Sequence, residues 1–148
     1  MAGKGFTVVE LLIVVGITVV LAAAAAPIYS NLQVSTQLDE ASAQITQDLR
    51  LAREQSRAGV YGVSHGVLFG ANSYTLYQGA SYAARDAAYD QINTFSKALA
   101  ITTTFPGNEV TFTTGTGAPS ATGTIVVAHD VSGTRTILVN DIGAAAEQ

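Results

Sequence analysis

The feature that most constrains this chain is an uncharged stretch near its N-terminus. Residues 11–38 of the 148 carry no formal charge, and residues 11–26 are almost entirely apolar. A helix with such a surface has to be buried, either in a membrane or against other apolar helices. Directly before this stretch stands a carboxylate, Glu10. Because an acid within an apolar membrane segment costs roughly 2.5–3.5 kcal/mol on insertion scales, Glu10 needs a functional explanation.

Three interpretations of residues 1–27 are open. The first is a secretory signal peptide, with Lys4 in its basic region and a small-residue cleavage site among residues 22–26. The second is an ordinary membrane anchor, since the apolar stretch is just long enough to span a bilayer. In the third, a short basic leader is cut between Gly5 and Phe6 and the apolar helix is kept. Only the third interpretation gives Glu10 a role that offsets its cost.

The run GFTVVELLIVVGI, which starts at Gly5, resembles the N-terminus of type IV pilins and of the pseudopilins of type II secretion. Gly5 matches the residue before the cut, Phe6 the new N-terminal residue, and Glu10 the fifth residue of the mature chain. Gly16 and Pro27 fall where such pilins often carry a helix-loosening glycine and proline. The resemblance therefore favours the third interpretation.

This resemblance implies a complete assembly scheme. A prepilin peptidase removes residues 1–5, the α-amino group of Phe6 becomes N-methylated, and an assembly platform in the cytoplasmic membrane builds the filament. The Phe6 amine of one subunit then meets the Glu10 carboxylate of a neighbour. Two opposite charges about 4 Å apart attract by about 4 kcal/mol at an effective dielectric of 20, before desolvation is subtracted. Such a pair also fixes the axial register, which uniform apolar packing cannot do.

Beyond the apolar stretch, the sequence predicts that the helix continues as an amphipathic one to about residue 58. Gly59 follows as a C-terminal stop signal, and Arg57 suits the helix dipole. The apolar positions recur at near-helical spacing, at Ile28, Leu32, Leu38, Ala41, Ile45, Leu49 and Ala52. We therefore expect three parts: a leader at 1–5, a transmembrane or filament-core helix at 6–29, and a globular domain at 30–148.

After residue 60 the pattern changes to that of strands. Alternating or β-branched runs occur at residues 63–69, 74–77, 110–113, 124–129 and 135–140. Residues 79–98 have no clear period and are expected to form a surface loop with at most one helical turn, and residues 115–123 a flexible loop. Because the strands follow the helix in a block, we expect an α+β, pilin-like fold in which the helix packs on an antiparallel β-sheet.

The strand-rich half resembles, more loosely, the H-type minor pseudopilins of type II secretion and the FimT-like minor pilins. Its spacing and residue classes match in two stretches, residues 51–79 and 123–143. Some FimT-like proteins bind DNA through a basic motif after the final strand, but here residues 143–147 read GAAAE, without arginine. The formal net charge is −4. We therefore expect no nucleic-acid partner.

The sequence contains no pattern that indicates a catalytic, metal-binding or phosphate-binding site. There is no cysteine, and His65 and His129 lie on separate predicted strands without carboxylates at ligand spacing. The run Gly115-Thr116-Gly117 lacks the lysine of a phosphate-binding loop. The tyrosines at 74, 77, 82 and 89 are expected to pack on the sheet or under the loop rather than to form an outer patch. We therefore expect no enzyme activity, no metal and no cofactor.

The sequence thus predicts a structural subunit of a type IV pilus-like filament, homo-oligomeric or mixed with other pilins. It would be a single-pass protein of the cytoplasmic membrane, in contact with lipid before assembly, and would end in a cell-surface pilus or a periplasmic pseudopilus. The alternatives are an H-type minor pseudopilin of a type II secretion system and a membrane-tethered binding module.

Overall fold

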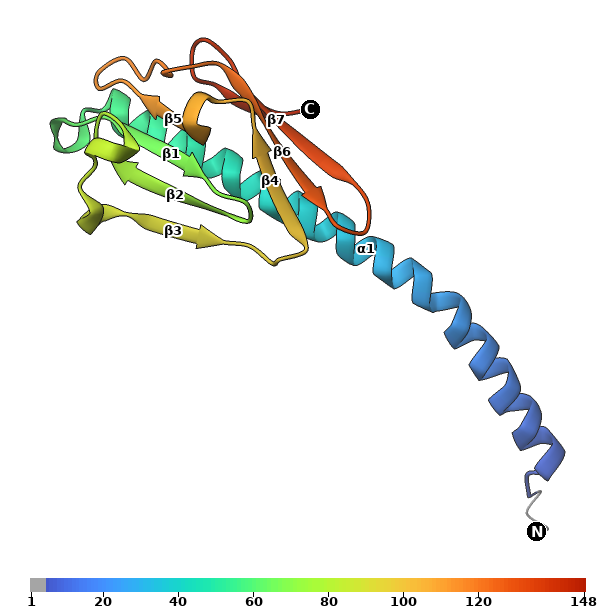
Figure 1. Cartoon of the computed structure of the whole chain (residues 1–148). Helices are drawn as coiled ribbons and strands as arrows, with labels where there is room; N and C mark the ends of the chain where they lie inside the picture. The colour runs from blue at the N-terminus through green and yellow to red at the C-terminus, as the bar shows by residue number, and fades with distance from the viewer. Residues whose placement is uncertain (1–4) are drawn as a thin grey trace.

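A computed structural model describes residues 5–148, apart from the side chains of residues 24–31. One long helix, α1 (Val8–Arg57), is followed by short strands and four single 3-10 turns (Figure 1). The strands are β1 (His65–Phe69), β2 (Ser73–Gln78), β3 (Gln91–Thr94), β4 (Leu99–Thr103), β5 (Glu109–Phe112), β6 (Gly123–His129), β7 (Thr134–Val139) and β8 (Ala145–Glu147). The 3-10 turns are η1 (Val60–Gly62), η2 (Tyr82–Ala84), η3 (Ala87–Tyr89) and η4 (Pro106–Asn108).

The helix α1 confirms the predicted helical range to within two residues at either end. Its 50 residues make it about 75 Å long. It runs without interruption through Gly16 and Pro27, and it ends at Arg57. Gly59 follows with φ +64°, a left-handed conformation that glycine adopts without steric cost. The predicted stop signal is therefore the one that the structure uses.

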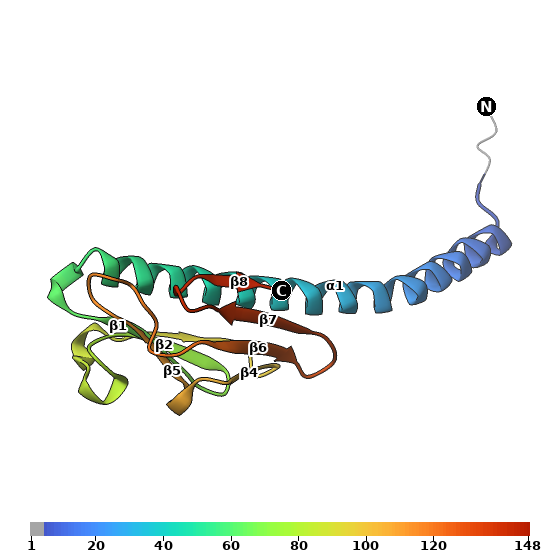
Figure 2. The ribbon, with the colours of Figure 1, turned by 90° about the horizontal axis from the view of Figure 1, so that it is seen from above.

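All strands pair in antiparallel fashion, but they form two four-stranded sheets and not the single sheet that the sequence predicted. The strand orders are β3-β2-β1-β5 and β4-β6-β7-β8. The chain passes from the first sheet to the second at β4, returns at β5 and leaves again at β6, so the sheets are interlocked by crossovers. Both sheets lie on the same side of α1, whose N-terminal half extends away from them (Figures 1 and 2).

The predicted strands and the last hairpin are confirmed, and three further strands appear. Within residues 79–98, the expected helical turn is confirmed by η2 and η3, but the prediction of a loop is wrong at residues 91–94, which form β3. No sequence pattern marked β4 or β8. Residues 115–122 of the predicted loop contain no helix or named strand, while Gly123 begins β6, and the loop packs on the end of α1, where the N–H of Gly115 donates to the carbonyl of Ser56 over 2.8 Å.

The core lies between the C-terminal half of α1 and the two sheets. The helix contributes one buried stripe at intervals of three and four residues: Val34, Leu38, Ala41, Ile45, Leu49 and Ala52. Fully buried strand residues face it, among them Val67, Val110, Phe112, Ile125, Val127, Ile137 and Val139. The prediction that Leu32 belongs to this stripe is wrong, because Leu32 is 60% exposed. The side chain of Ile28 lies outside the described residues.

Polar contacts fix how α1 sits on the strands. The Tyr74 hydroxyl on β2 donates to Asp48 of α1 over 2.6 Å. On β7, the Arg135 guanidinium pairs with Asp39 of α1 over 2.7 Å. Burial and the neighbouring Asp48 carboxylate together raise the pKa of Tyr74 well above its usual value, so the hydroxyl stays a donor at neutral pH. Each sheet is therefore attached to α1 by a contact that involves a charged group.

Candidate functional site

The start of α1 contains the residues that the sequence predicts for processing and assembly. Gly5 and Phe6 precede the helix, and the Phe6 side chain is 79% exposed. Residues 1–4 of the predicted leader lie outside the described residues, so cleavage between Gly5 and Phe6 and methylation of Phe6 stay predictions. In the structure, the predicted cleavage site precedes the first turn of α1, and the exposed apolar part of the helix follows directly after it.

Glu10 has a local role that the sequence analysis missed. Thr7 is the N-cap of α1, and its Oγ1 accepts a hydrogen bond from the backbone N–H of Glu10 over 3.2 Å. Glu10 is thus the third helical residue of a Thr-x-x-Glu sequence, the signature of a capping box. A carboxylate in the first turn also interacts favourably with the helix dipole, by about 0.3–1 kcal/mol. The sequence TVVE itself carried this signal.

The described side chains at the start of α1, residues 8–23, form an apolar rod that stands clear of the strands (Figure 1). The large apolar side chains of the rod, and that of Phe6 before it, are each more than half exposed: Val8, Val9, Leu11, Leu12, Ile13, Val14, Val15, Ile17, Val19, Val20 and Leu21. The Thr18 hydroxyl within the rod donates back to the carbonyl of Val14 over 2.7 Å, so it is satisfied inside the helix. Glu10 is therefore the only charged side chain on the described part of the rod.

Among the residues that the structure describes, no helical stretch is both long enough and apolar enough to cross a membrane. Gly16 lies on an open face, since a Cβ at this position would have no atom within 4 Å. Pro27 lies within α1, but its side chain is outside the described residues. Whether Gly16 and Pro27 loosen the helix in an assembly stays a prediction.

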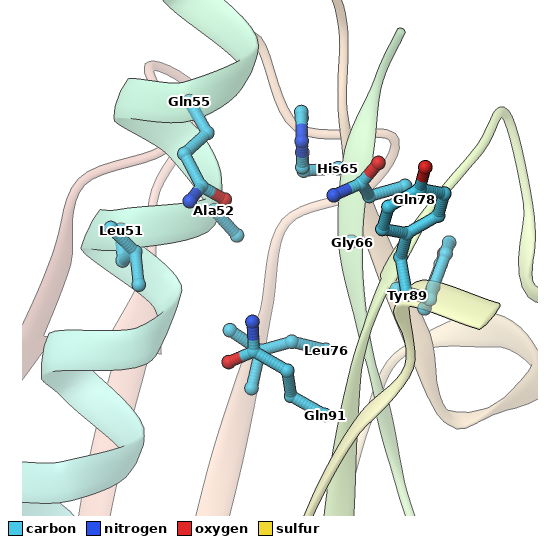
Figure 3. A pocket seen from close by; sticks show the side chains of 10 residues that line it. Leu51, Ala52, Gln55, His65, Gly66, Leu76, Gln78, Tyr89 and Gln91 are labelled. Atoms are coloured by element: carbon cyan, nitrogen blue, oxygen red, sulfur yellow. The ribbon is translucent and has the colours of Figure 1, made fainter. Parts of the chain in front are cut away.

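A small polar cavity lies between α1 and the first sheet (Figure 3). It has a volume of about 30 Å³ and is lined by residues that include Gln55 of α1, His65 of β1 and Gln78 of β2. His65 is only 3% exposed, and within the described part of the chain neither ring nitrogen forms a hydrogen bond. Burial lowers the pKa of His65, against a smaller opposing effect of the Val63 carbonyl. The ring therefore sits neutral in the helix–sheet interface.

The two histidines do not come together. His65 lies in the first sheet and His129 at the end of β6 in the second. The Nδ1 of His129 lies 2.9 Å from Asp130, and its Nε2 lies 3.3 Å from the amide oxygen of Gln37 on α1. Across the described residues, no group of three or more His, Cys, Asp or Glu side chains could hold a metal ion.

The four tyrosines of the prediction, at 74, 77, 82 and 89, differ in burial, and Tyr82 is half-buried with its ring edge-on to that of Tyr77 at 5.6 Å. Tyr74 and Tyr77 are buried under the sheet and the loop, as predicted, and Tyr77 lies close to the Thr111 hydroxyl. Burial is the main cause that raises the pKa of Tyr77 to about 12. By contrast, Tyr61 and Tyr89 are 75% and 51% exposed, so the prediction of buried packing is wrong for Tyr89.

Comparison with known proteins identifies the fold. No family model and no curated protein matches the chain. Among solved structures, the minor pseudopilin EpsH from the type 2 secretion system of Vibrio cholerae aligns with a TM-score of 0.60 at 12% identity, over 76% of this chain and 96% of that one. The type IV minor pilin FimU of Pseudomonas aeruginosa PAO1 aligns with a TM-score of 0.61 at 14% identity, over 77% and 90%.

At such low identity the likeness shows the fold alone. The chain has the pilin-like α+β fold of these minor pilins and pseudopilins, with a long helix packed on antiparallel strands. The predicted resemblance of the strand-rich half to this group is therefore confirmed at the level of the fold.

Proposed function

We propose that this chain is a structural subunit of a type IV pilus-like filament, processed by a prepilin peptidase between Gly5 and Phe6. The observation that carries the proposal is the exposed apolar rod at residues 8–23, in which Glu10 is the only charged side chain. An apolar surface of this extent is stable only when lipid or other apolar helices cover it. The pilin-like fold supports this use of the helix. The C-terminal half of α1 packs its own apolar stripe, Val34 to Ala52, on the sheets, so the rod is not needed to hold the globular domain together.

The chain divides by role into three parts. Residues 1–5 are a leader, residues 6–29 are the helix buried first in the cytoplasmic membrane and then in the filament core, and residues 30–148 are the globular domain. The helix carries the globular domain on its C-terminal half, so the domain faces outward when the N-terminal halves bundle. An assembly platform in the cytoplasmic membrane moves the subunit from lipid into the filament.

In the filament, the Glu10 carboxylate pairs with the Phe6 α-amino group of a neighbouring subunit. The capping contact from Thr7 engages only the backbone N–H of Glu10, so the carboxylate remains free to accept an outside partner. A pair at about 4 Å is worth about 4 kcal/mol at an effective dielectric of 20 before desolvation. Without the pair, each charge would stand alone among apolar helices, which is the costly state.

A second candidate is an H-type minor pseudopilin of a type II secretion system. Its support is the loose sequence resemblance of residues 51–79 and 123–143 to H-type minor pseudopilins, together with a fold that the chain shares with EpsH and equally with the minor pilin FimU. Subunit abundance in purified filaments separates the two: a pilus-forming subunit makes up the bulk of the filament, and a minor subunit a small fraction. A membrane-tethered binding module, the third possibility, would not enter filaments at all.

The test compares Glu10→Gln with Glu10→Ala. Glutamine still serves as the third residue of a capping box, whereas alanine does not, so the pair separates helix capping from charge. If the charge is required, both variants reach the membrane but yield few filaments in the sheared fraction. Normal filament numbers for Glu10→Gln, with loss only for Glu10→Ala, would refute the pairing and leave capping as the role of Glu10. Thr18→Val, which changes another polar residue of the rod, is the matched control and should assemble normally.

Processing is checked on the native protein by intact-mass measurement. The mass should correspond to loss of residues 1–5, with one added methyl group. Retention of Met1, or cleavage after Ala26, would contradict the proposed leader.

A further inference from the structure

A second exposed site lies at the far end of the molecule from Glu10, beyond the C-terminus of α1. An open groove of about 170 Å³ lies there, and it is lined by Tyr61 of η1, Val63, Gln78 at the end of β2, and Asp86 and Tyr89 at η3. The Tyr61 and Tyr89 rings lie side by side, with centroids 6.1 Å apart and planes at 31°. Figure 1 shows this end of the domain opposite the extended N-terminal rod. The groove thus combines two aromatic faces with one carboxylate.

The backbone at Tyr61 is strained without any burial to offset it. Tyr61 has φ +56° and ψ +9°, the left-handed region that bulky side chains rarely adopt. Such a conformation costs roughly 1–3 kcal/mol and occurs mostly at functional sites. The side chain is nevertheless 75% exposed. The strained backbone therefore places the Tyr61 ring in solvent beside Tyr89. Within the monomer, burial of this ring contributes little that would offset the cost of the strain.

Elsewhere in the same domain, an aromatic ring and a carboxylate together hold an arginine side chain. A few residues away, the Arg85 guanidinium lies 3.6 Å from the centroid of the Tyr82 ring and pairs with Asp90 over 2.8 Å. A guanidinium stacks on an aromatic face and bonds a carboxylate at its edge at the same time. Tyr82 and Asp90 thus form a similar site that already holds the guanidinium of Arg85. In the groove, Tyr61 and Tyr89 supply the rings and Asp86 supplies the carboxylate.

The carboxylate of the groove lacks such a partner. Asp86 is exposed, and Oδ1 accepts the backbone N–H of Ala88 over 3.0 Å. Within the described part of the chain no basic side chain pairs with it. The formal net charge of −4 adds a weak attraction for cations. A neutral ligand would use the rings but would leave this charge without a counterpart.

We propose that the groove of Tyr61, Tyr89 and Asp86 binds an arginine side chain of a partner protein. The guanidinium stacks on the two rings, and its edge bonds the Asp86 carboxylate, with the Gln78 amide at the border of the groove. The site lies at the opposite end of the molecule from the apolar rod, so the contacts between bundled rods do not themselves cover it. The proposal does not depend on filament formation, because it uses only residues of the globular domain.

The test is a titration of the full-length protein in detergent micelles, labelled with 3-fluorotyrosine and observed by fluorine NMR. Tyr61→Phe and Tyr89→Phe assign their two signals. The probe is the peptide acetyl-Gly-Arg-Gly-amide, and the matched probe carries citrulline, which is neutral and nearly isosteric. The Tyr61 and Tyr89 signals should shift saturably with the arginine peptide and hardly at all with the citrulline peptide, while the buried Tyr74 and Tyr77 signals stay in place.

Two variants separate recognition from folding. Asp86→Asn should weaken binding of the arginine peptide by about threefold or more, as loss of an exposed charge pair does. Tyr61→Asn removes the ring but suits the left-handed backbone, so it should abolish binding without lowering the midpoint of thermal unfolding. Equal shifts with the citrulline peptide, unchanged affinity in Asp86→Asn, or shifts produced by methyl glucoside and not by the arginine peptide would each overturn the proposal.

Discussion

Replacing Gly66 by alanine should destabilise the globular domain more than any other single methyl group added to the first sheet. Gly66 lies in β1, between β2 and β5, and opposite Tyr77. A Cβ at this position would lie 2.5 Å from the Tyr77 Cζ and 2.8 Å from the Val110 carbonyl oxygen. The ring cannot move away cheaply, since it is 1% exposed and its hydroxyl contacts Thr111.

The magnitude follows from these contacts. Forcing one extra carbon into a well-packed core costs about 1–3 kcal/mol. One of the three obstructing atoms, the Val110 carbonyl oxygen, belongs to the backbone of a paired strand, which cannot rotate aside, so we expect a loss of about 2–3 kcal/mol. For a domain of this size, each kcal/mol lowers the midpoint of thermal unfolding by about 2–5 °C, which gives a decrease of about 4–15 °C.

The assay is thermal unfolding of the full-length protein in detergent, followed by near-UV circular dichroism of its tyrosines. Gly16→Ala is the matched control, because a Cβ at Gly16 has no atom within 4 Å and alanine favours the helix. The double variant Gly66→Ala with Tyr77→Leu should lose less than the sum of the two single changes. A midpoint for Gly66→Ala within about 1 °C of the wild type would refute the packing argument.

Three further predictions use other parts of the structure. Tyr74→Phe removes the hydroxyl that donates to Asp48 over 2.6 Å and should lower the unfolding free energy by about 1–2 kcal/mol in urea titrations; no change would mean that the contact adds nothing. Because burial lowers the pKa of His65, the unfolded chain takes up this proton at a higher pH than the folded chain, so stability should fall as the pH drops below about 6.5. His65→Leu should flatten that part of the stability profile, and an unchanged slope would show that His65 does not cause it. Gly5→Leu should block cleavage and leave the intact precursor in the membrane fraction, and mature-sized protein would place the cut elsewhere.

Local patterns predicted the helix and the longer strands because their signals lie within a few residues. The stripe from Leu38 to Ala52 repeats every three or four residues, and Gly59 ends the helix through its own backbone freedom. The pair of strands β6 and β7 alternates clearly and is joined by a short turn, so the hairpin was visible in the sequence as well. Leu32 fits the same spacing, but it is exposed because the strands do not cover this part of α1.

The missed strands depend on distant partners. β3 has only four residues, three of them exposed, and it becomes a strand because β2 offers it an edge to pair with. β8 is Ala-Ala-Glu, which has little strand propensity, and it pairs with β7 while its Ala145 carbonyl accepts from Arg50 of α1. The groove at Tyr61 escaped prediction for the same reason, since residues 61 and 89 are 28 positions apart and meet only when β1 and β2 of the first sheet have paired.

The most direct test of the account is a map of the native filament that resolves side chains at the helix ends. The account predicts that the Glu10 carboxylate of one subunit lies about 4 Å from the Phe6 α-amino nitrogen of a neighbouring subunit. A map in which Glu10 faces lipid or solvent, or contacts only the first turn of its own helix, would contradict it.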